Sequence, residues 1–152
     1  MQQPIQPNDP RPGIFDRPWS NTPYGILLMD DEEGILDSFG KLLKMKGFVV
    51  YAACNGEQAV DLYKQSLYSK RKVDVAVIDL TIPDGMGGLE TIARLKEIDP
   101  DVRAIATTGH LEDDQAFEYK KYGFFMVLPK PYVLEELLDA IDGVIRMERI
   151  YP

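Results

Sequence analysis

Cysteine and histidine are nearly absent from this sequence of 152 residues, which contains one of each. Cys54 has no second cysteine with which to form an internal disulfide, and the single His110 is too few for a zinc site of cysteine and histidine ligands. No apolar run approaches the ~20 residues that a membrane-spanning helix needs, and the N-terminus lacks the basic and then apolar pattern of a secretory signal. The composition therefore favours a cytoplasmic protein with no membrane contact by this segment.

Positive charge is also scarce, since 17 lysines and arginines face 25 acidic residues and leave a formal net charge of -8. Such a charge repels the phosphate backbone of nucleic acids, so we expect no nucleic-acid partner. The one basic run, Lys70-Arg71-Lys72, lies between two predicted elements and is interpreted as a solvated connection. The length suits one domain, and the hydrophobic content of 45% is enough for a sizeable core.

Proline divides the chain into a tail and a domain, because six of the eleven prolines lie before Tyr24. Proline lacks a backbone donor and interrupts both helices and strands. We therefore predict a Pro-rich N-terminal tail or linker over residues 1–23, a folded domain over 24–148 and a short C-terminal tail over 149–152.

Apolar segments and amphipathic segments alternate through the domain. Mostly apolar runs bounded by turn residues predict five strands, near residues 26–29, 48–53, 73–78, 102–107 and 126–128. Apolar residues at spacings of three and four predict helices near 32–46, 57–69, 89–98 and 134–145, and residues 112–122 are also expected to be helical although their apolar residues show little periodicity. In the first helix the predicted inward residues are Ile35, Leu36, Phe39, Leu42 and Leu43. The alternation predicts a three-layer α/β/α sandwich with right-handed crossovers.

Chemically active side chains follow four of the five predicted strands, namely Asp30-Asp31, Asp79, Thr108 and Lys130. Parallel strands bring their carboxyl ends to one edge of the sheet, which is where such folds bind ligands. Three carboxylates there would repel one another by a few kcal/mol per pair at an effective dielectric of about 20. They are suited to Mg²⁺, which prefers oxygen ligands and joins carboxylates to phosphate. A simpler alternative covers part of the pattern: Asp31 could be a helix N-cap, with Glu32 and Glu33 at the positive end of the helix dipole.

The ordered motifs resemble the response-regulator receiver domain of two-component signalling, over about residues 24–145. They are Met29-Asp30-Asp31-Glu32, Val77-Ile78-Asp79-Leu80-Thr81-Ile82-Pro83, Thr107-Thr108-Gly109 and Lys130-Pro131. The amino-acid sequences of the segments Ile82–Gly88 and Leu128–Tyr132 are most similar to those of receivers in hybrid sensor histidine kinases. The resemblance implies a flavodoxin-like (βα)5 fold with strand order 2-1-3-4-5.

The resemblance also implies a role for each site residue. Asp79 would be the phosphoacceptor, attacking the phosphorus of a phosphohistidine with Mg²⁺ bound. The metal ligands would be Asp30, Asp31, Asp79 and the main-chain carbonyl of Thr81. Lys130 would pair with the phosphoryl oxygens and the Thr108 hydroxyl would turn toward them. The peptide before Pro131 would be cis.

The implied partner is a sensor histidine kinase or a histidine phosphotransfer protein. A homodimer could form through the face of the last two strands and the last two helices. The chain would assist its own phosphorylation and dephosphorylation and would not be a turnover enzyme.

Several positions depart from the commonest receiver pattern. Val127 stands three residues before the lysine, where many receivers have an aromatic residue that couples phosphorylation to the output face. The loop 83–88 is one residue longer than the commonest form. Thr81 and His110 occupy positions that tune hydrolysis of the acyl phosphate, so replacing His110 is expected to change the dephosphorylation rate with little effect on folding.

Two other functions remain open at this point. The chain could be an interaction module with the receiver fold that phosphorylation does not regulate, although every acidic and basic site residue is present. It could also be a phosphatase of the haloacid-dehalogenase type, which likewise uses an aspartyl nucleophile. That class needs a second acid two positions after the nucleophile, and Thr81 occupies that position after Asp79.

Overall fold

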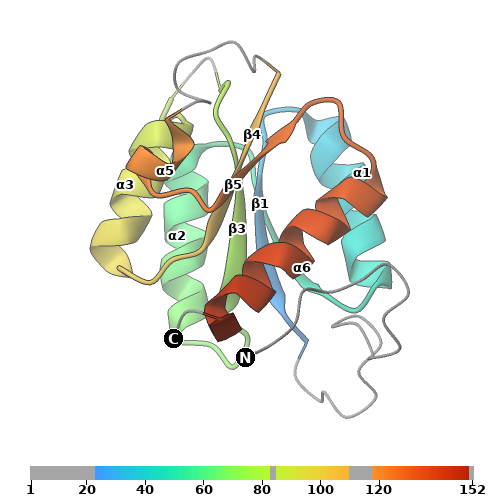
Figure 1. Cartoon of the computed structure of the whole chain (residues 1–152), viewed down its shortest axis with the longest axis horizontal. Helices are drawn as coiled ribbons and strands as arrows, with labels where there is room; N and C mark the ends of the chain where they lie inside the picture. Colours follow the sequence, from blue (N-terminus) through green and yellow to red (C-terminus); the bar gives the residue numbers. More distant parts are fainter. Residues whose placement is uncertain (1–22, 83–84, 110–117, 151–152) are drawn as a thin grey trace.

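Five parallel strands form one sheet in the part of the chain that the computed structural model describes, residues 23–82, 85–109 and 118–150 (Figure 1). The strands are β1 (Gly25–Met29), β2 (Val49–Ala53), β3 (Val73–Asp79), β4 (Ala104–Thr108) and β5 (Met126–Pro129). Their order across the sheet is β2-β1-β3-β4-β5, and each neighbouring pair is parallel. The predicted flavodoxin-like topology is confirmed.

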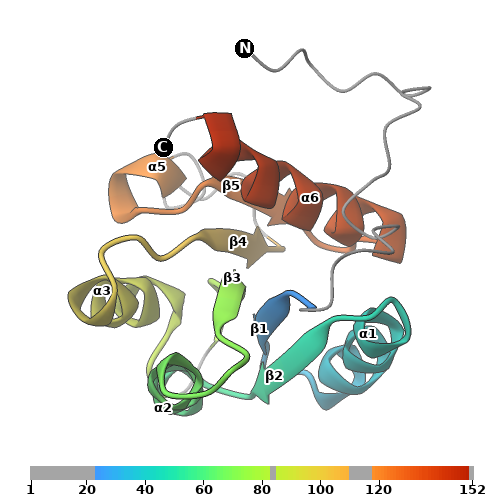
Figure 2. The same cartoon turned by 90° about the horizontal axis from the view of Figure 1, so that it is seen from below.

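Helices cover both faces of this sheet. They are α1 (Glu33–Met45), α2 (Gly56–Leu67), α3 (Gly88–Ile98), α5 (Tyr119–Tyr122) and α6 (Leu134–Ile150). Figure 2 shows α1 and α6 on one face and α2, α3 and α5 on the other. None of these helices is both long enough and apolar enough to cross a membrane.

Two hydrophobic clusters fill the space between sheet and helices, and β1 contributes alternately to both. Ile26 and Leu28 pack into the cluster under α1 and α6, while Leu27 and Met29 pack into the cluster under α2 and α3. All four side chains are at most 1% exposed. A strand covered on both faces needs apolar residues at every position, which is why this strand could be predicted from a continuous apolar run.

The start of α1 differs from the prediction. Glu32, and not Asp31, occupies the N-cap position, and no side chain makes a capping hydrogen bond there. Farther along α1, Leu42 is 37% exposed, so its assignment to the buried face was wrong, whereas Leu43 is fully buried. The capping interpretation is therefore wrong for Asp31, whereas Glu33 lies in the first turn of α1, at the positive end of the helix dipole, as expected.

Helix α2 begins at Gly56, one residue before the predicted start at residue 57. Asn55 is the N-cap, and its side chain accepts a hydrogen bond of 2.9 Å from the backbone N–H of Gln58. Helix α5 begins at Tyr119, within the predicted helix 112–122, and residues 110–117 lie outside the described part. Helix α6 continues to Ile150, into the predicted tail 149–152.

Candidate functional site

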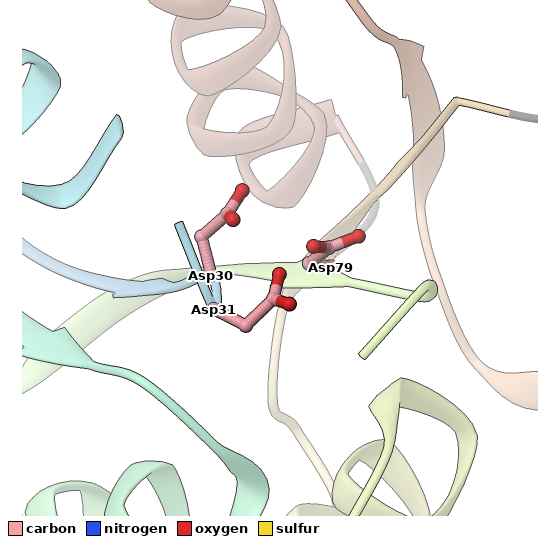
Figure 3. A group of neighbouring side chains, drawn as sticks. All are labelled: Asp30, Asp31 and Asp79. Carbon is pink, nitrogen blue, oxygen red and sulfur yellow. The ribbon is translucent and has the colours of Figure 1, made fainter. Parts of the chain in front are cut away.

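Three carboxylates converge at the carboxyl ends of β1 and β3 (Figure 3). One oxygen from each of Asp30, Asp31 and Asp79 lies within 4.8 Å of the other two. Asp30 is 1% exposed and Asp79 is fully buried, whereas Asp31 faces solvent. The prediction that the ends of these strands bring the acids together is confirmed.

Backbone hydrogen bonds between strand ends hold this arrangement. The N–H of Asp30 donates to the carbonyl of Ala53 at 3.0 Å, and the N–H of Leu80 donates to the carbonyl of Thr107 at 2.9 Å. Asp30 and Asp79 thus lie where the backbone hydrogen bonding between neighbouring strands of the sheet ends.

Lys130 reaches the acids from the end of β5. Its Nζ lies 2.8 Å from Asp30 Oδ2 and 3.0 Å from Asp79 Oδ2, and 3.9 Å from the more exposed Glu32 carboxylate. The contact with Asp79 is a hydrogen bond. The contact with Asp30 is an ion pair whose angles do not meet the geometry of a hydrogen bond. Asp30 Oδ2 accordingly has no hydrogen-bond partner within the described residues. One ammonium therefore balances two buried carboxylates.

Opposing effects act on the pKa values of these groups. Burial raises the pKa of Asp30, and the contact with Lys130 and the N–H of Glu32 oppose that rise. Burial by itself would lower the pKa of Lys130, but its contacts with Asp30 and Asp79 outweigh burial and raise that pKa. Lys130 is therefore fully protonated at neutral pH, and its positive charge at the site is constant.

Thr81 fixes the second oxygen of Asp79. Both its backbone N–H, at 3.0 Å, and its hydroxyl, at 2.8 Å, donate to Asp79 Oδ1. The two oxygens of Asp79 thus have different environments, with Thr81 on Oδ1 and Lys130 on Oδ2. The sequence pointed to the main-chain carbonyl of Thr81 as a metal ligand and to Thr81 as a position that tunes hydrolysis, but not to this hydroxyl contact with Asp79.

Thr108 ends β4 beside these groups and is 1% exposed. Its carbonyl accepts a hydrogen bond of 2.8 Å from the N–H of Lys130, which links the threonine directly to the backbone of the lysine. The Lys130-Pro131 peptide is cis, as the resemblance implies. Phe124 is buried in the core, and Val127 packs against the same cluster.

The loop after Asp79 is tied to α2. The N–H of Gly56 donates to the carbonyl of Met86 at 3.1 Å, and the Glu57 carboxylate accepts from the Met86 N–H at 3.3 Å. On the other side, a Cβ at Gly88 would lie 2.7 Å from the carbonyl oxygen of Asp79. A glycine is needed there because the start of α3 touches the backbone of the site.

Most of the predicted site residues thus lie together, namely Asp30, Asp31, Asp79, Thr81, Thr108 and Lys130. His110 lies outside the described residues. Three neighbours of the site were not predicted from the sequence: Glu32, whose carboxylate contacts Lys130; Glu57, which contacts the loop; and Tyr132, which is buried and lines the same cavity as Lys130. No local pattern marks Glu57, because its contact joins residues 29 positions apart.

The donor set fits a hard divalent cation. It consists of carboxylate oxygens without nitrogen or sulfur, and two of the acids are buried with one lysine as their counter-charge. Mg²⁺ binds such oxygen ligands and keeps several waters, which the exposed side at Asp31 accommodates. Asp30, Asp31 and Asp79 are the side chains that would hold it.

Comparisons with known proteins agree with this geometry. Residues 26–142 match the sequence profile of the response regulator receiver domain. The chain is 34% identical over 116 residues to sporulation initiation phosphotransferase F of Bacillus subtilis (strain 168), covering 76% of this chain and 89% of that protein. It is 32% identical to the response regulator receiver protein Anae109_2439 of Anaeromyxobacter sp. (strain Fw109-5), covering 74% of this chain and 45% of that protein.

Among solved structures, a response regulator receiver domain protein from Clostridium thermocellum superposes with a TM-score of 0.74 and 29% identity. The match covers 85% of this chain and 99% of that one.

Proposed function

Because this chain belongs to the family of response regulator receiver domains, we propose that Asp79 accepts a phosphoryl group from a phosphohistidine in a two-component phosphorelay. The observation that carries the proposal is the position of Lys130, whose Nζ contacts both Asp30 and Asp79. A buried aspartate with an adjacent fixed cation and two further acids is what metal-assisted phosphoryl transfer to a carboxylate requires.

Different residues of the site have different roles in the transfer of the phosphoryl group. Thr81 holds Oδ1 of Asp79, so Oδ2 is presented on the Lys130 side. A carboxylate oxygen of Asp79 attacks phosphorus, the P–N bond of the phosphohistidine breaks, and its electron pair goes to the imidazole nitrogen. Asp30, Asp31 and Asp79 would hold Mg²⁺, which when bound would neutralise charge on the carboxylates and phosphoryl oxygens.

The product is an acyl phosphate that carries a charge of about −1.5 to −2. The Lys130 ammonium pairs with a phosphoryl oxygen, and the Thr108 hydroxyl turns to donate to another. The new charge changes the packing of the surface near β4 and β5, and so switches protein contacts. In this proposal the chain is a switch and not a turnover enzyme, and it works in the cytoplasm with its phosphoryl donor.

A cavity beside the site suits the donor protein. It has a volume of about 390 Å³, and its lining combines apolar side chains with the charged edge of the site: Glu32, Ile35, Phe39, Lys130, Pro131 and Tyr132. A helix of a histidine kinase or phosphotransfer protein that packs on this surface would bring its phosphohistidine next to Asp79. A homodimer through the face of β4, β5, α5 and α6 is a second expected contact, to be tested by sedimentation with and without phosphorylation.

The proposal is tested by phosphorylation with a small phosphodonor, such as phosphoramidate, in the presence of Mg²⁺. Intact mass should increase by one phosphoryl group in the native chain and should not increase in Asp79→Asn or without Mg²⁺. Asp142→Asn is the matched control, because Asp142 pairs with Arg146 on α6 away from the site. Equal labelling of the native chain and Asp79→Asn would overturn the assignment of the nucleophile.

A further inference from the structure

A second cavity lies at the edge of the sheet where β4 and β5 begin, which is the edge opposite to the one that carries Asp79. Helices α3 and α6 both end toward this edge (Figure 1). The cavity has a volume of about 670 Å³. Small-molecule sites typically have volumes of about 300 to 1,000 Å³, so this cavity has the size of a ligand site.

The apolar part of the lining is held by the core and the sheet. Phe124 is 2% exposed, and the N–H of Phe125 donates to the carbonyl of Ala104 at 2.8 Å. Met147 adds a flexible thioether from α6. Two aromatic rings and a methionine form a lining suited to the flat, apolar body of a ligand.

Positive charge accompanies this apolar lining, although the chain as a whole has a net charge of -8. Three of the lining side chains are cationic, Lys96, Arg103 and Lys120, and one is acidic, Asp101. A concave site whose walls carry mostly one sign of charge attracts ligands of the opposite sign. The cavity therefore favours an anion.

The ammonium of Lys96 is brought against the wall of the cavity without a partner from the protein. Gly123 has φ +106°, and a Cβ built on it would lie 2.0 Å from Lys96 Cε and 2.5 Å from Lys96 Nζ. The lysine side chain thus lies across the bare backbone of Gly123. Within the described part of the chain, no hydrogen bond or ion pair engages this ammonium, so its charge is available to a ligand.

We propose that this cavity is a binding site for a small organic anion, with an aromatic or other flat apolar body against Phe124, Phe125 and Met147 and a carboxylate or phosphate paired with Lys96 and Lys120. The concave shape favours a small molecule over the surface of a partner protein. None of the three acids near the phosphoryl site lines this cavity, so the inference does not depend on the proposed function.

The test uses 8-anilinonaphthalene-1-sulfonate, a fluorescent aromatic anion, with the native chain in a chelator. We expect saturable binding that added salt weakens. Lys96→Gln and Lys120→Gln should each weaken binding about threefold, the effect of one exposed ion pair, and the double variant about tenfold. Lys121→Gln is the matched control, because Lys121 neighbours Lys120 in the chain but pairs with Glu118 and does not line the cavity. It should bind the probe with native affinity.

The neutral analogue N-phenyl-1-naphthylamine separates charge from apolar packing, because it has the same rings without the sulfonate. Its affinity should be the same in the native chain and in both lysine variants. Urea midpoints equal to that of the native chain would show that the variants remain folded, as expected for exposed lysines.

Competition identifies the anionic group. Naphthalene-1-acetate and 1-naphthyl phosphate share a ring system, so the stronger competitor of the bound probe shows whether carboxylate or phosphate is preferred. Failure of both to displace the probe would overturn the inference. So would absence of saturable probe binding to the native chain, or equal affinities for Lys96→Gln, Lys120→Gln and Lys121→Gln.

Discussion

Lys130→Met tests the electrostatic balance of the site, because it removes the ammonium and keeps most of the side-chain volume. At an effective dielectric of about 20, the contacts at 2.8 and 3.0 Å each correspond to an attraction of about 5 to 6 kcal/mol. Burial of the ammonium, whose side chain is 14% exposed, opposes much of that attraction. Removing one partner of a buried ion pair typically costs about 3 to 5 kcal/mol. We expect a loss of about 3 kcal/mol in metal-free buffer, since partial exposure and protonation of an acid limit the effect.

The assay is urea unfolding at pH 7 with a chelator and again with Mg²⁺. With a slope of about 1.5 kcal/mol per molar, the expected loss lowers the unfolding midpoint by about 2 M. Mg²⁺ should stabilise Lys130→Met more than the native chain, because the ion no longer competes with a fixed cation. Lys121→Met is the matched control: Lys121 pairs with Glu118 at 3.6 Å on the surface, and such pairs contribute at most about 1 kcal/mol.

Two results would refute this reasoning. A loss in Lys130→Met no larger than in Lys121→Met would mean that the acids do not depend on the ammonium for their stability. Equal stabilisation of the native chain and Lys130→Met by Mg²⁺ would mean that the lysine and the metal do not share the same carboxylates.

Three further predictions concern the neighbours of Asp79. Burial raises the pKa of Asp30 above its value in the unfolded chain. The protonated Asp30 side chain therefore contributes to the stability of the fold below pH ~4, and this contribution is lost as the pH rises through the pKa of Asp30 in the folded state. Asp30→Asn should therefore unfold at higher urea than the native chain at pH 7 without metal and should lose this advantage toward acid pH; a constant difference across a pH series would contradict this. Thr81→Val should lose about 1 kcal/mol through the missing hydroxyl donor, whereas Thr81→Ser should not; equal urea midpoints for the two variants would argue against the contact. Gly88→Ala should lower the free energy of unfolding by about 1 to 3 kcal/mol, because the added Cβ would meet the carbonyl oxygen of Asp79. The same change should weaken Mg²⁺ binding, and a Mg²⁺ affinity equal to that of the native chain in titration calorimetry would contradict this.

The sequence predicts the fold and the chemistry of the site because both depend on patterns that are local in the chain. A strand covered on both faces, such as β1, is apolar throughout, and four of the five strand ends carry an acid, a hydroxyl or a lysine. Once strand order is known, those ends must meet, so Asp30, Asp79 and Lys130 come together as expected.

What the sequence could not supply depends on side-chain direction and on contacts between distant segments. The acidic run was explained partly as a helix cap, but Asp30 accepts from the N–H of Glu32, and Glu32 occupies the N-cap position without a side-chain cap. The contact of Glu57 with the loop at Met86 depends on how α2 lies beside α3. Tyr132 is one apolar ring among many in the sequence, and only burial of its hydroxyl distinguishes it.

The parallel order of the strands also sets when the site can exist during synthesis. The hydrogen bond between Lys130 and Asp79 joins residues 51 positions apart, and the lysine is on the last strand to leave the ribosome. A nascent chain that ends before β5 has its acids but no ammonium to balance them. We expect such a chain to be unable to accept a phosphoryl group, so under the proposed function only molecules whose folding has reached β5 would be phosphorylated.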